Sequence, residues 1–319
     1  DDWSLELYAH KTFANTTKAF EVLTTWVNKQ TDTSVPIRYV MEATGVYHES
    51  LAYWLDEKEI LVSVVLPNKI SNYSRTLDIK TVTDKTSSDA IARFGLERNL
   101  DNWKRPNPVY KKLRQLSRER NQLISERTMV KNELHAEQAE AEPNKQSIGR
   151  IKKRIVLLNK QEKEIKAEIS DLIQAHEESK KVTKLICSVP GIGLLTAAAV
   201  LSETNGFDLI RNKRQLASYA GLDVKDKQSG TSEKGKPRIS KQGNKHLRKA
   251  MHLPALSAIR HDERFKAVFT RLVQKHGIKM KAAVAVQRKL LEMVFTVYKT
   301  GISYDKNYLT RGIELVELD

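Results

Sequence analysis

Residues 148–172, with the sequence IGRIKKRIVLLNKQEKEIKAEISDL, decide how the middle of the chain folds. The positions that recur in steps of three and four are Ile148, Ile151, Ile155, Leu158, Glu162, Ile165, Ile169 and Leu172, of which only Glu162 is polar. A second heptad-compatible series lies upstream, at Leu113, Leu116, Leu123, Val130 and Leu134, with Arg120 and Arg127 in its gaps. Such stripes, sustained over several heptads beside densely charged outer faces, predict a coiled coil. Pro143 between them predicts a helical hairpin. Two helices of a globular bundle remain the alternative.

The sequence on either side of this hairpin has a different character. Before it, short β-branched or alternating runs (4–9, 38–41 and 60–66) alternate with helical stretches (16–27 and 47–58). Strands that alternate with helices predict an α/β domain. After the hairpin, the pattern is mostly helical. We therefore predict an α/β domain at 1–107, a coiled coil for dimerisation or linkage at 108–181, and a mostly helical domain at 182–319.

The chain carries a large positive charge. Its 55 Lys and Arg residues against 39 Asp and Glu residues give a net charge of +16. An excess of this size predicts a polyanionic partner, most simply nucleic acid. The single cysteine, Cys187, excludes a disulfide framework and a CxxC zinc site. The sequence has no apolar run long enough to cross a membrane and no secretory signal, so we expect a cytoplasmic protein without a membrane partner.

The turn at 188–193, Ser-Val-Pro-Gly-Ile-Gly, lies between two predicted helices. An apolar-Pro-Gly-apolar-Gly turn is typical of a helix-hairpin-helix motif, in which the glycines let a phosphate approach the backbone closely. Gly191 and Gly193 are therefore candidate nucleic-acid-binding residues. A plain tight turn between packed helices is the alternative.

The segment 211–249 holds 12 Lys and Arg residues against 3 acids, and within it Ser229 stands between Gln228 and Gly230. An exposed serine among cations could act as a nucleophile on a phosphodiester, with the cations offsetting the developing negative charge. Ser/Gly/Lys loops are more often solvated linkers, so this pattern alone is weak. The candidate nucleic-acid-binding residues of this segment are Lys234, Lys236, Arg238, Lys241, Asn244 and Arg248.

Three acids of the first domain are candidate metal ligands. Glu42 directly follows the predicted strand at 38–41, and Asp84 and Asp89 lie near the start of a later helix. Carboxylates that converge from a strand end and a helix suit Mg²⁺ or Mn²⁺, the usual companions of phosphodiester cleavage. A helix cap or a solvated acid is the alternative for each residue alone.

Several segments in this order resemble the insertion-sequence transposases with a RuvC-like DEDD domain, relatives of the Piv DNA invertase that include bridge-RNA-guided serine recombinases. The Glu-Ala-Thr-Gly and Ser-Lys-x-Gly-Asn-x-x-Leu-Arg elements are the most specific in combination. The segments that carry the resemblance are 11–16, 41–47, 83–85, the coiled coil, 189–193, 219–222, 229–230 and 238–248.

This resemblance implies an RNase-H-like domain whose four acids bind divalent metal, and a C-terminal domain with helix-hairpin-helix whose serine attacks DNA. Glu42 matches the second acid, Asp84 the third and Ser229 the serine, with Ser232 as the fallback. The first acid is expected on a strand before Trp3. Ser87 stands where the fourth acid is expected, and Asp89 is the nearest carboxylate.

We therefore expect a DNA transposase or recombinase, associated with the nucleoid of a prokaryotic cell. It would act on donor and target DNA through Ser229, assisted by a metal site and guided by a structured bridge RNA. Because two duplexes must be joined, we expect the coiled coil to make a dimer that pairs into a tetramer. The alternatives are a Holliday-junction-type nuclease that uses metal-bound water, and a non-catalytic nucleic-acid scaffold.

Overall fold

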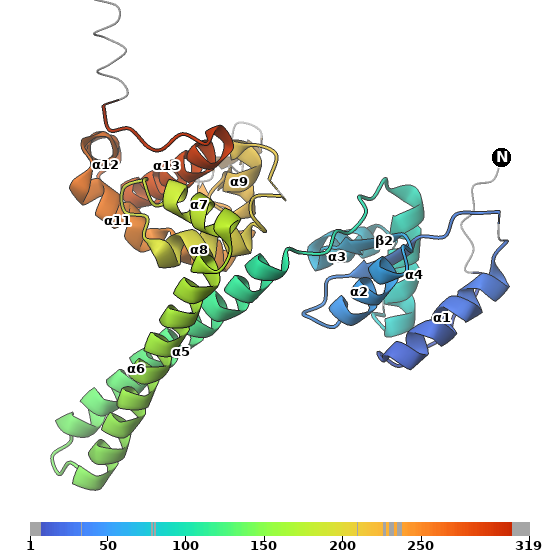
Figure 1. The fold of residues 1–319 in the computed structure, drawn as a ribbon, viewed down its shortest axis with the longest axis horizontal. Coiled ribbons are helices and arrows are strands. Elements are labelled where there is room, and N and C mark those ends of the chain that lie inside the picture. The colour runs from blue at the N-terminus through green and yellow to red at the C-terminus, as the bar shows by residue number, and fades with distance from the viewer. Residues whose placement is uncertain are drawn as a thin grey trace, which may run out of the picture. The chain divides into compact units, whose positions relative to one another are not determined.

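The computed structural model describes residues 8–32, 34–77, 79, 81–208, 210–225 and 238–307, and of 228–229 and 233–234 the backbone. Contacts divide the chain into two units, 1–105 and 106–319 (Figure 1). Both are dominated by helices. Among the described residues, no helix is both long and apolar enough to cross a bilayer.

The first unit is built on one β-α-β crossover. Its elements are α1 (Thr17–Gln30), β1 (Tyr39–Glu42), α2 (Glu49–Glu57), β2 (Val62–Val65), α3 (Pro67–Thr76) and α4 (Asp84–Glu97). The strands β1 and β2 pair in parallel, with Glu42 opposite Val65. The predicted strands at 38–41 and 60–66 and the helices at 16–27 and 47–58 are thus confirmed to within a few residues. Most of the predicted strand at 4–9 lies outside the described residues, and Tyr8 and Ala9 belong to no strand.

The sheet of this first unit has two strands among the described residues. That supports an α/β unit but is too little to establish an RNase-H-like sheet. The packing around it is specific: Phe20 of α1 contacts Trp54 of α2 with ring centroids 5.9 Å apart. Tyr73 of α3 packs edge-on against Phe94 of α4.

The second unit begins with the predicted hairpin. Its helices are α5 (Pro108–Ala139), α6 (Lys145–Gln174), α7 (Glu177–Ile186), α8 (Leu194–Glu203), α9 (Lys213–Tyr219), α10 (Lys245–Ala250), α11 (His252–His261), α12 (Glu263–His276) and α13 (Lys279–Thr300). Four two-residue strands lie between α9 and α10: β3 (Val224–Lys225), β4 (Gln228–Ser229), β5 (Glu233–Lys234) and β6 (Arg238–Ile239). Figure 1 shows α5 and α6 as a long arm that projects from the other helices of this unit.

The coiled-coil seam is closed within one chain. Val130 of α5 packs against Ile151 and Leu158 of α6, and all three side chains are at most 5% exposed. We expected this stripe to face a helix of a second chain. It instead faces α5, because the turn near Pro143 folds the two helices back on each other.

The base of the arm belongs to the main core of the second unit. Leu113 of α5 and Ile169 of α6 join the apolar cluster that also contains Leu201, Leu247 and Leu290. The predicted boundary between residues 181 and 182 therefore falls inside one contact unit. The base of the hairpin shares one hydrophobic core with the helices that follow it.

Candidate functional site

The acidic residues of the first unit lie around the carboxyl end of β1. Glu42 is the last residue of that strand and is half-buried, and Thr44 Oγ1 donates to Glu42 Oε1 at 2.8 Å. The end of α4 returns to the opposite, amino end of the strands. There Arg38 Nη1 donates to the carbonyl of Leu100, and the Trp103 amide donates to the carbonyl of Val62. The N-terminus of α4 consequently points toward the edge that holds Glu42.

Asp84 lies in the first turn of α4, after Thr83, which forms a capping box with Thr86. This helix approaches the sheet at Gly95, where an added Cβ would lie 2.7 Å from Val40 Cγ2. Asp84 is three helical turns before Gly95, so it shares the sheet-facing side of α4, about 16 Å along the axis. A carboxylate in the first turn is stabilised by the helix dipole.

Asp89 lies on another side of α4, rotated by about 120° from Gly95. Arg93 Nε donates to both of its carboxylate oxygens, at 3.1 and 3.2 Å. Asp89 is therefore engaged in an ion pair within its own helix. Among the residues that the structure describes, no three His, Cys, Asp or Glu side chains gather as a metal site. The carboxylate chemistry fits a divalent metal, but the geometry of these three residues does not yet form a site. Asp1 and Asp2, near the expected first acid, lie outside the described residues.

Ser229 lies in a β-loop between α9 and α10, which we call the serine loop (residues 223–240). At its base, β3 pairs antiparallel with β6, with Val224 opposite Ile239. Further out, β4 pairs with β5, with Ser229 opposite Glu233. The side chains of Ser229 and Lys234, and the whole of Ser232 and Lys236, lie outside what the structure describes.

The base of the serine loop is held by a buried network that the sequence did not predict. Glu203, 3% exposed at the end of α8, receives two hydrogen bonds from Arg118 of α5, at 2.8 and 2.9 Å. Asn244 Nδ2 donates to the same carboxylate at 2.7 Å, and the Tyr219 hydroxyl donates to the Glu203 carbonyl at 2.8 Å. Burial alone would raise the pKa of Glu203, but the hydrogen bonds from Arg118 and Asn244 lower it. Glu203 is thus a buried anion that links three helices.

Two of the predicted nucleic-acid-binding residues serve this network. Asn244 also caps α10 by accepting from the amides of His246 and Leu247, each at 2.9 Å. Arg248 Nη1 donates to the carbonyl of Ala220 at 2.7 Å. Their geometry is therefore that of anchors for the loop. Lys241 and Arg238 are exposed beside them.

Glycines let the two ends of the serine loop approach each other. Gly243 has φ +127°, and a Cβ on it would lie 2.4 Å from the Tyr219 carbonyl oxygen. Gly221 has φ +65°, and a Cβ there would lie 2.5 Å from Arg248 Nη1. These positions require glycine for both space and conformation. The Tyr-Ala-Gly-Leu and Ser-Lys-x-Gly-Asn-x-x-Leu-Arg elements therefore form one structural unit.

The predicted helix-hairpin-helix arrangement is present as α7, a turn and α8. Its two glycines have different surroundings. Gly191 has φ +82°, and a Cβ there would lie 2.4 Å from the Pro254 carbonyl oxygen, so this glycine serves close packing against α11. Gly193 is exposed at the N-cap of α8, with nothing within 4 Å of a Cβ position. Only Gly193 offers open backbone to a phosphate.

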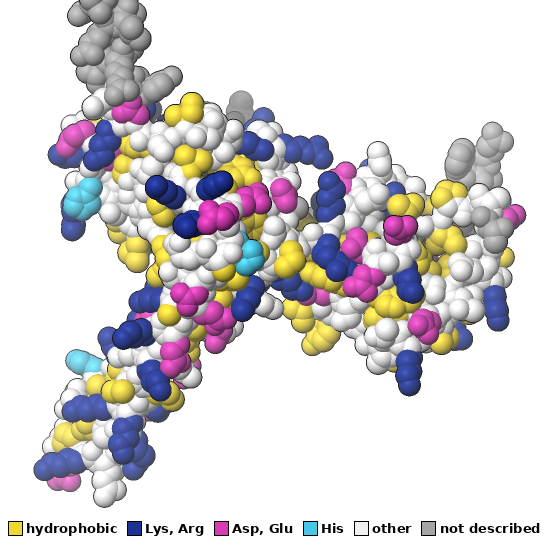
Figure 2. Space-filling view, viewed as in Figure 1, with side chains coloured by type: hydrophobic (Ala, Val, Ile, Leu, Met, Phe, Trp, Pro, Cys, Tyr) yellow, Lys and Arg dark blue, Asp and Glu magenta, His cyan; other side chains and the backbone are white. Residues whose placement is uncertain are grey.

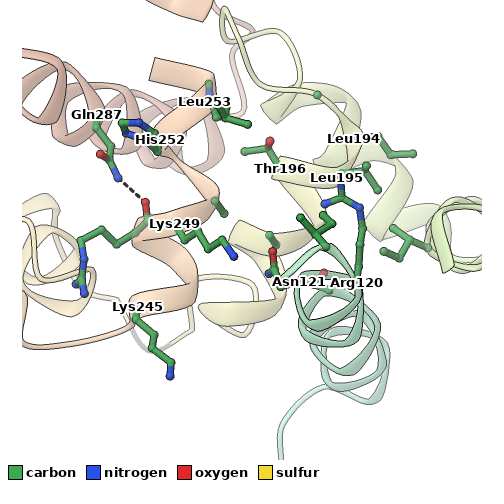
Figure 3. A pocket seen from close by; sticks show the side chains of 18 of the residues that line it. Arg120, Asn121, Leu194, Leu195, Thr196, Lys245, Lys249, His252, Leu253 and Gln287 are labelled. Carbon is green, nitrogen blue, oxygen red and sulfur yellow. Dashed lines mark hydrogen bonds between the residues drawn. The ribbon is translucent and has the colours of Figure 1, made fainter. Parts of the chain in front are cut away.

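Basic side chains lie near the N-terminus of α8. Figure 3 shows Lys245, Lys249 and His252 of α10 and α11 facing a hollow, with Arg120 of α5 on the opposite side. Figure 2 shows Lys and Arg side chains over much of the hairpin arm as well. The surface chemistry is that of a polyanion-binding protein.

Sequence comparisons with known proteins identify the family of this chain. A sequence model described as "Transposase", of the DEDD type, matches residues 4–138, and that of the transposase IS116/IS110/IS902 family matches residues 183–270. The pilin gene-inverting protein of Moraxella bovis is 30% identical over 300 residues, which cover 92% of this chain and 90% of that protein. The chain belongs to the IS110 transposase family. The resemblance seen in the sequence is confirmed.

Two further relatives agree with this membership. The pilin gene-inverting protein of Moraxella lacunata has the same identity and coverage. The transposase for insertion sequence element IS1111A of Coxiella burnetii is 27% identical over 154 residues, which cover 46% of this chain and 41% of that protein. The protein is accordingly an enzyme of the transposase class. Its DEDD family implies dependence on a divalent metal ion.

Proposed function

We propose that this IS110-family transposase cuts and rejoins donor and target DNA through Ser229. The Ser229 hydroxyl oxygen attacks the phosphorus of a DNA phosphodiester and its proton passes to a base. The bond to one DNA oxygen breaks, and that oxygen leaves as a hydroxyl after taking up a proton. A hydroxyl from another DNA end then attacks the phosphoserine ester and releases Ser229. The ester conserves the bond energy, so strand exchange needs no nucleotide cofactor.

The observation that carries this proposal is the anchoring of the serine loop. The motif residues that follow the loop hold its base: Gly243 lies in close backbone contact with Tyr219, and Asn244 and Arg248 donate hydrogen bonds to Glu203 and Ala220. A loop anchored this firmly, with a serine and several cations beyond its base, is suited to presenting one hydroxyl to a phosphate.

We further propose that Glu42, Asp84 and Asp89 bind the divalent metal ion, Mg²⁺ or Mn²⁺. When bound, such an ion would neutralise phosphate charge. Asp84 is supported by its place on the sheet-facing side of α4, and Glu42 by its place at the strand end. Asp89 would first have to leave Arg93. The RNase-H-like character of the first unit belongs to the same proposal.

The partners and the place of action follow the same reasoning. A structured bridge RNA suits the basic surfaces, which can hold RNA by its shape and backbone. A homodimer that pairs into a tetramer would supply the several active sites needed to join two duplexes. The outer faces of the hairpin remain free for such an assembly, since its seam is closed within one chain. A transposase of this kind would work at the nucleoid.

The decisive experiment uses suicide DNA substrates with the full-length protein and Mg²⁺. We expect a denaturant-resistant protein–DNA adduct that mass spectrometry maps to Ser229. Ser229→Ala should abolish the adduct while nearly retaining DNA affinity, because one neutral hydroxyl contributes little beside so many cations. An adduct at Ser232 would show that Ser232, and not Ser229, is the nucleophile. Cleavage without any adduct would instead establish a metal-dependent nuclease.

A further inference from the structure

A groove of about 970 Å³ lies between the base of the hairpin arm and the helices that follow it. We call it the α5–α8 groove. Its walls come from α5 (Ser117 to Ile124), the N-terminus of α8 (Gly193 to Thr196), the α10–α11 region (Lys245 to Pro254) and α13. Its charged or titratable lining residues are Arg120, Lys241, Lys245, Arg248, Lys249 and His252, and among the described residues no carboxylate lines it.

Two polar atoms of α5 in this groove have no hydrogen-bond partner among the described residues. Ser117 is 7% exposed, and its Oγ is buried and unpaired. Arg120 Nη2 forms an ion pair with Glu162 Oε1 at 3.2 Å, but the Arg120 Nε is buried and unpaired among the described residues. A buried donor without an acceptor is destabilising in the free protein. Both residues line the groove, so an anion that enters it can accept from these two donors once their side chains turn toward the opening.

The N-terminus of α8 adds a third source of donors. Its N-cap is Gly193, which provides no side chain to cap the helix. The first amides of a helix and the helix dipole favour a phosphate at this end. Gly193 is also the one glycine of its turn that faces open space.

Two lysines extend the positive charge to the mouth of the groove. Lys245 and Lys249 are exposed, and neither pairs with a carboxylate in the part of the chain that the structure describes. Lys249 points toward Asn121 of α5 in Figure 3. The lysines thus face the same opening as the unpaired groups of α5.

We infer that the α5–α8 groove binds a backbone phosphate of the DNA, with Ser117 and Arg120 of the coiled-coil helix as part of the DNA-contacting surface. The inference rests on the proposed function only in taking DNA as the polyanion. It makes the base of the hairpin a DNA-binding element, in addition to its role in packing.

The first test measures the affinity of the full-length protein for a short DNA duplex over a range of salt concentrations. Lys245→Gln combined with Lys249→Gln should weaken binding about tenfold and reduce the slope of log Kd against log salt by about 2, since each phosphate contact contributes about 0.9. The matched control is Lys275→Gln with Lys279→Gln, two exposed lysines outside the groove, which should change affinity less than about twofold.

The second test replaces Ser117 by alanine. This removes the unpaired hydroxyl without opening a sizeable cavity, so the melting temperature should not fall. Affinity for the duplex should fall about tenfold to a hundredfold, the loss expected for one hydrogen bond to a charged group. An unchanged affinity in both Ser117→Ala and the double lysine variant would overturn the inference.

Inorganic phosphate tests whether the groove binds a phosphate of the DNA backbone or a free phosphate ion. If phosphate alone raises the melting temperature and Ser117→Ala removes that effect while DNA affinity stays unchanged, the groove serves a small anion and the DNA assignment is wrong. The adduct experiment keeps the two proposals separate. A Ser229 adduct with normal DNA binding by the groove variants refutes only the groove. Weakened binding by these variants without any adduct refutes only the serine chemistry.

Discussion

At the scale of single residues, Glu203 is a buried carboxylate held by partners from several helices. It is buried, accepts from Arg118 and Asn244, and lies 85 residues from the first and 41 from the second. Removal of one partner from a buried ion pair leaves the other charge uncompensated. The serine loop depends on this residue because Asn244 forms the end of the loop's base.

We expect Glu203→Gln to lower the free energy of unfolding by about 3 kcal/mol, because the Arg118 guanidinium loses its anion. Formation of the Ser229 adduct should fall more than DNA affinity does, since the loop base loosens while the surface cations stay. Urea denaturation measures the first effect and adduct yield the second. Glu263→Gln, an exposed acid, is the control and should behave as wild type. Equal stability of Glu203→Gln and wild type would contradict the role of the network.

The proposed metal ligands are tested by isosteric changes. Glu42→Gln, Asp84→Asn and Asp89→Asn each remove one charge at nearly constant size. Each should lower metal affinity and recombination by about 10- to 100-fold or more while the fold is retained. Isothermal titration with Mn²⁺ and a recombination assay in cells measure these effects, with Glu21→Gln as the control. Normal recombination by Asp89→Asn would show that Asp89 is not a metal ligand and serves only in its ion pair with Arg93.

At the scale of elements, the hairpin carries one charged layer inside its apolar seam. Glu162 of α6 interrupts the heptads of its helix, and Arg120 and Arg127 interrupt those of α5. In the structure both arginines pair with Glu162, as does Lys166 at 2.8 Å. The polar exceptions of the two stripes therefore meet each other. Such a layer specifies the register of a coiled coil at some cost in stability.

The charged layer should make the hairpin sensitive to acid. Burial alone would raise the pKa of Glu162, but hydrogen bonds from Lys166 and Arg127 lower it from 4.5 to about 2. A carboxylate with a lowered pKa in the folded state stabilises above its unfolded pKa, and this contribution is lost as the pH falls through the folded value. We expect the melting temperature to fall between about pH 4.5 and pH 2. Glu162→Gln should lose this part of the pH dependence, whereas Glu164→Gln, an exposed acid in the same helix, should retain it.

The seam itself can be tested against the outer face of the same helix. Leu158 is 5% exposed and Ile155 packs beside it, whereas Val156 and Leu157 are 67% and 54% exposed. Changing Ile155 and Leu158 to Asp would bury unpaired charge and cost on the order of several kcal/mol. Circular dichroism should show loss of helix in the arm.

The matched control changes Val156 and Leu157 to Asp. Helix content should stay unchanged, because neither side chain lies in the seam. If the proposed oligomer uses the outer face of the arm, light scattering should show a smaller mass for this control variant. Unchanged helix content in the seam variant would contradict closure of the seam within one chain.

At the scale of the whole molecule, the proposed reaction needs both units. The acids lie in the first unit and Ser229 in the second. The sequence around Ser229 does not have the spacing of a catalytic triad, so we propose that the acids of the first unit help to activate its hydroxyl. The acids of the first unit and Ser229 of the second are therefore expected to serve the same reaction.

This cooperation predicts a specific defect in one full-length variant. Glu42→Gln should abolish the adduct at Ser229, although the two residues belong to different units, while DNA affinity stays nearly unchanged because the basic surfaces are intact. Gel analysis of the trapped adduct and fluorescence anisotropy measure the two properties. An undiminished adduct in Glu42→Gln would show that the second unit activates its serine alone.

Several elements of this protein could be predicted from the amino-acid sequence alone. The hairpin, the strands at β1 and β2, the turn before α8 and the family membership follow from periodicity, turn residues and motifs, which are local properties. The sequence also indicated that Gly191, Gly193 and Asn244 are candidate nucleic-acid-binding residues. It did not show whether they contact phosphate or serve the packing of the protein.

Only the tertiary structure decided what those residues contact. In the folded chain, Gly191 packs against α11, and Arg118 and Asn244 both donate hydrogen bonds to Glu203. The apolar seam is closed between α5 and α6. Folding also leaves Ser117 buried and unpaired beside the N-terminus of α8. The physical reason is that helix and strand patterns depend on neighbours a few residues away, whereas hydrogen-bond partners and burial are set by segments that meet only after packing. A buried charge such as that of Glu203 is stable only where distant donors converge on it, and no local pattern records that convergence.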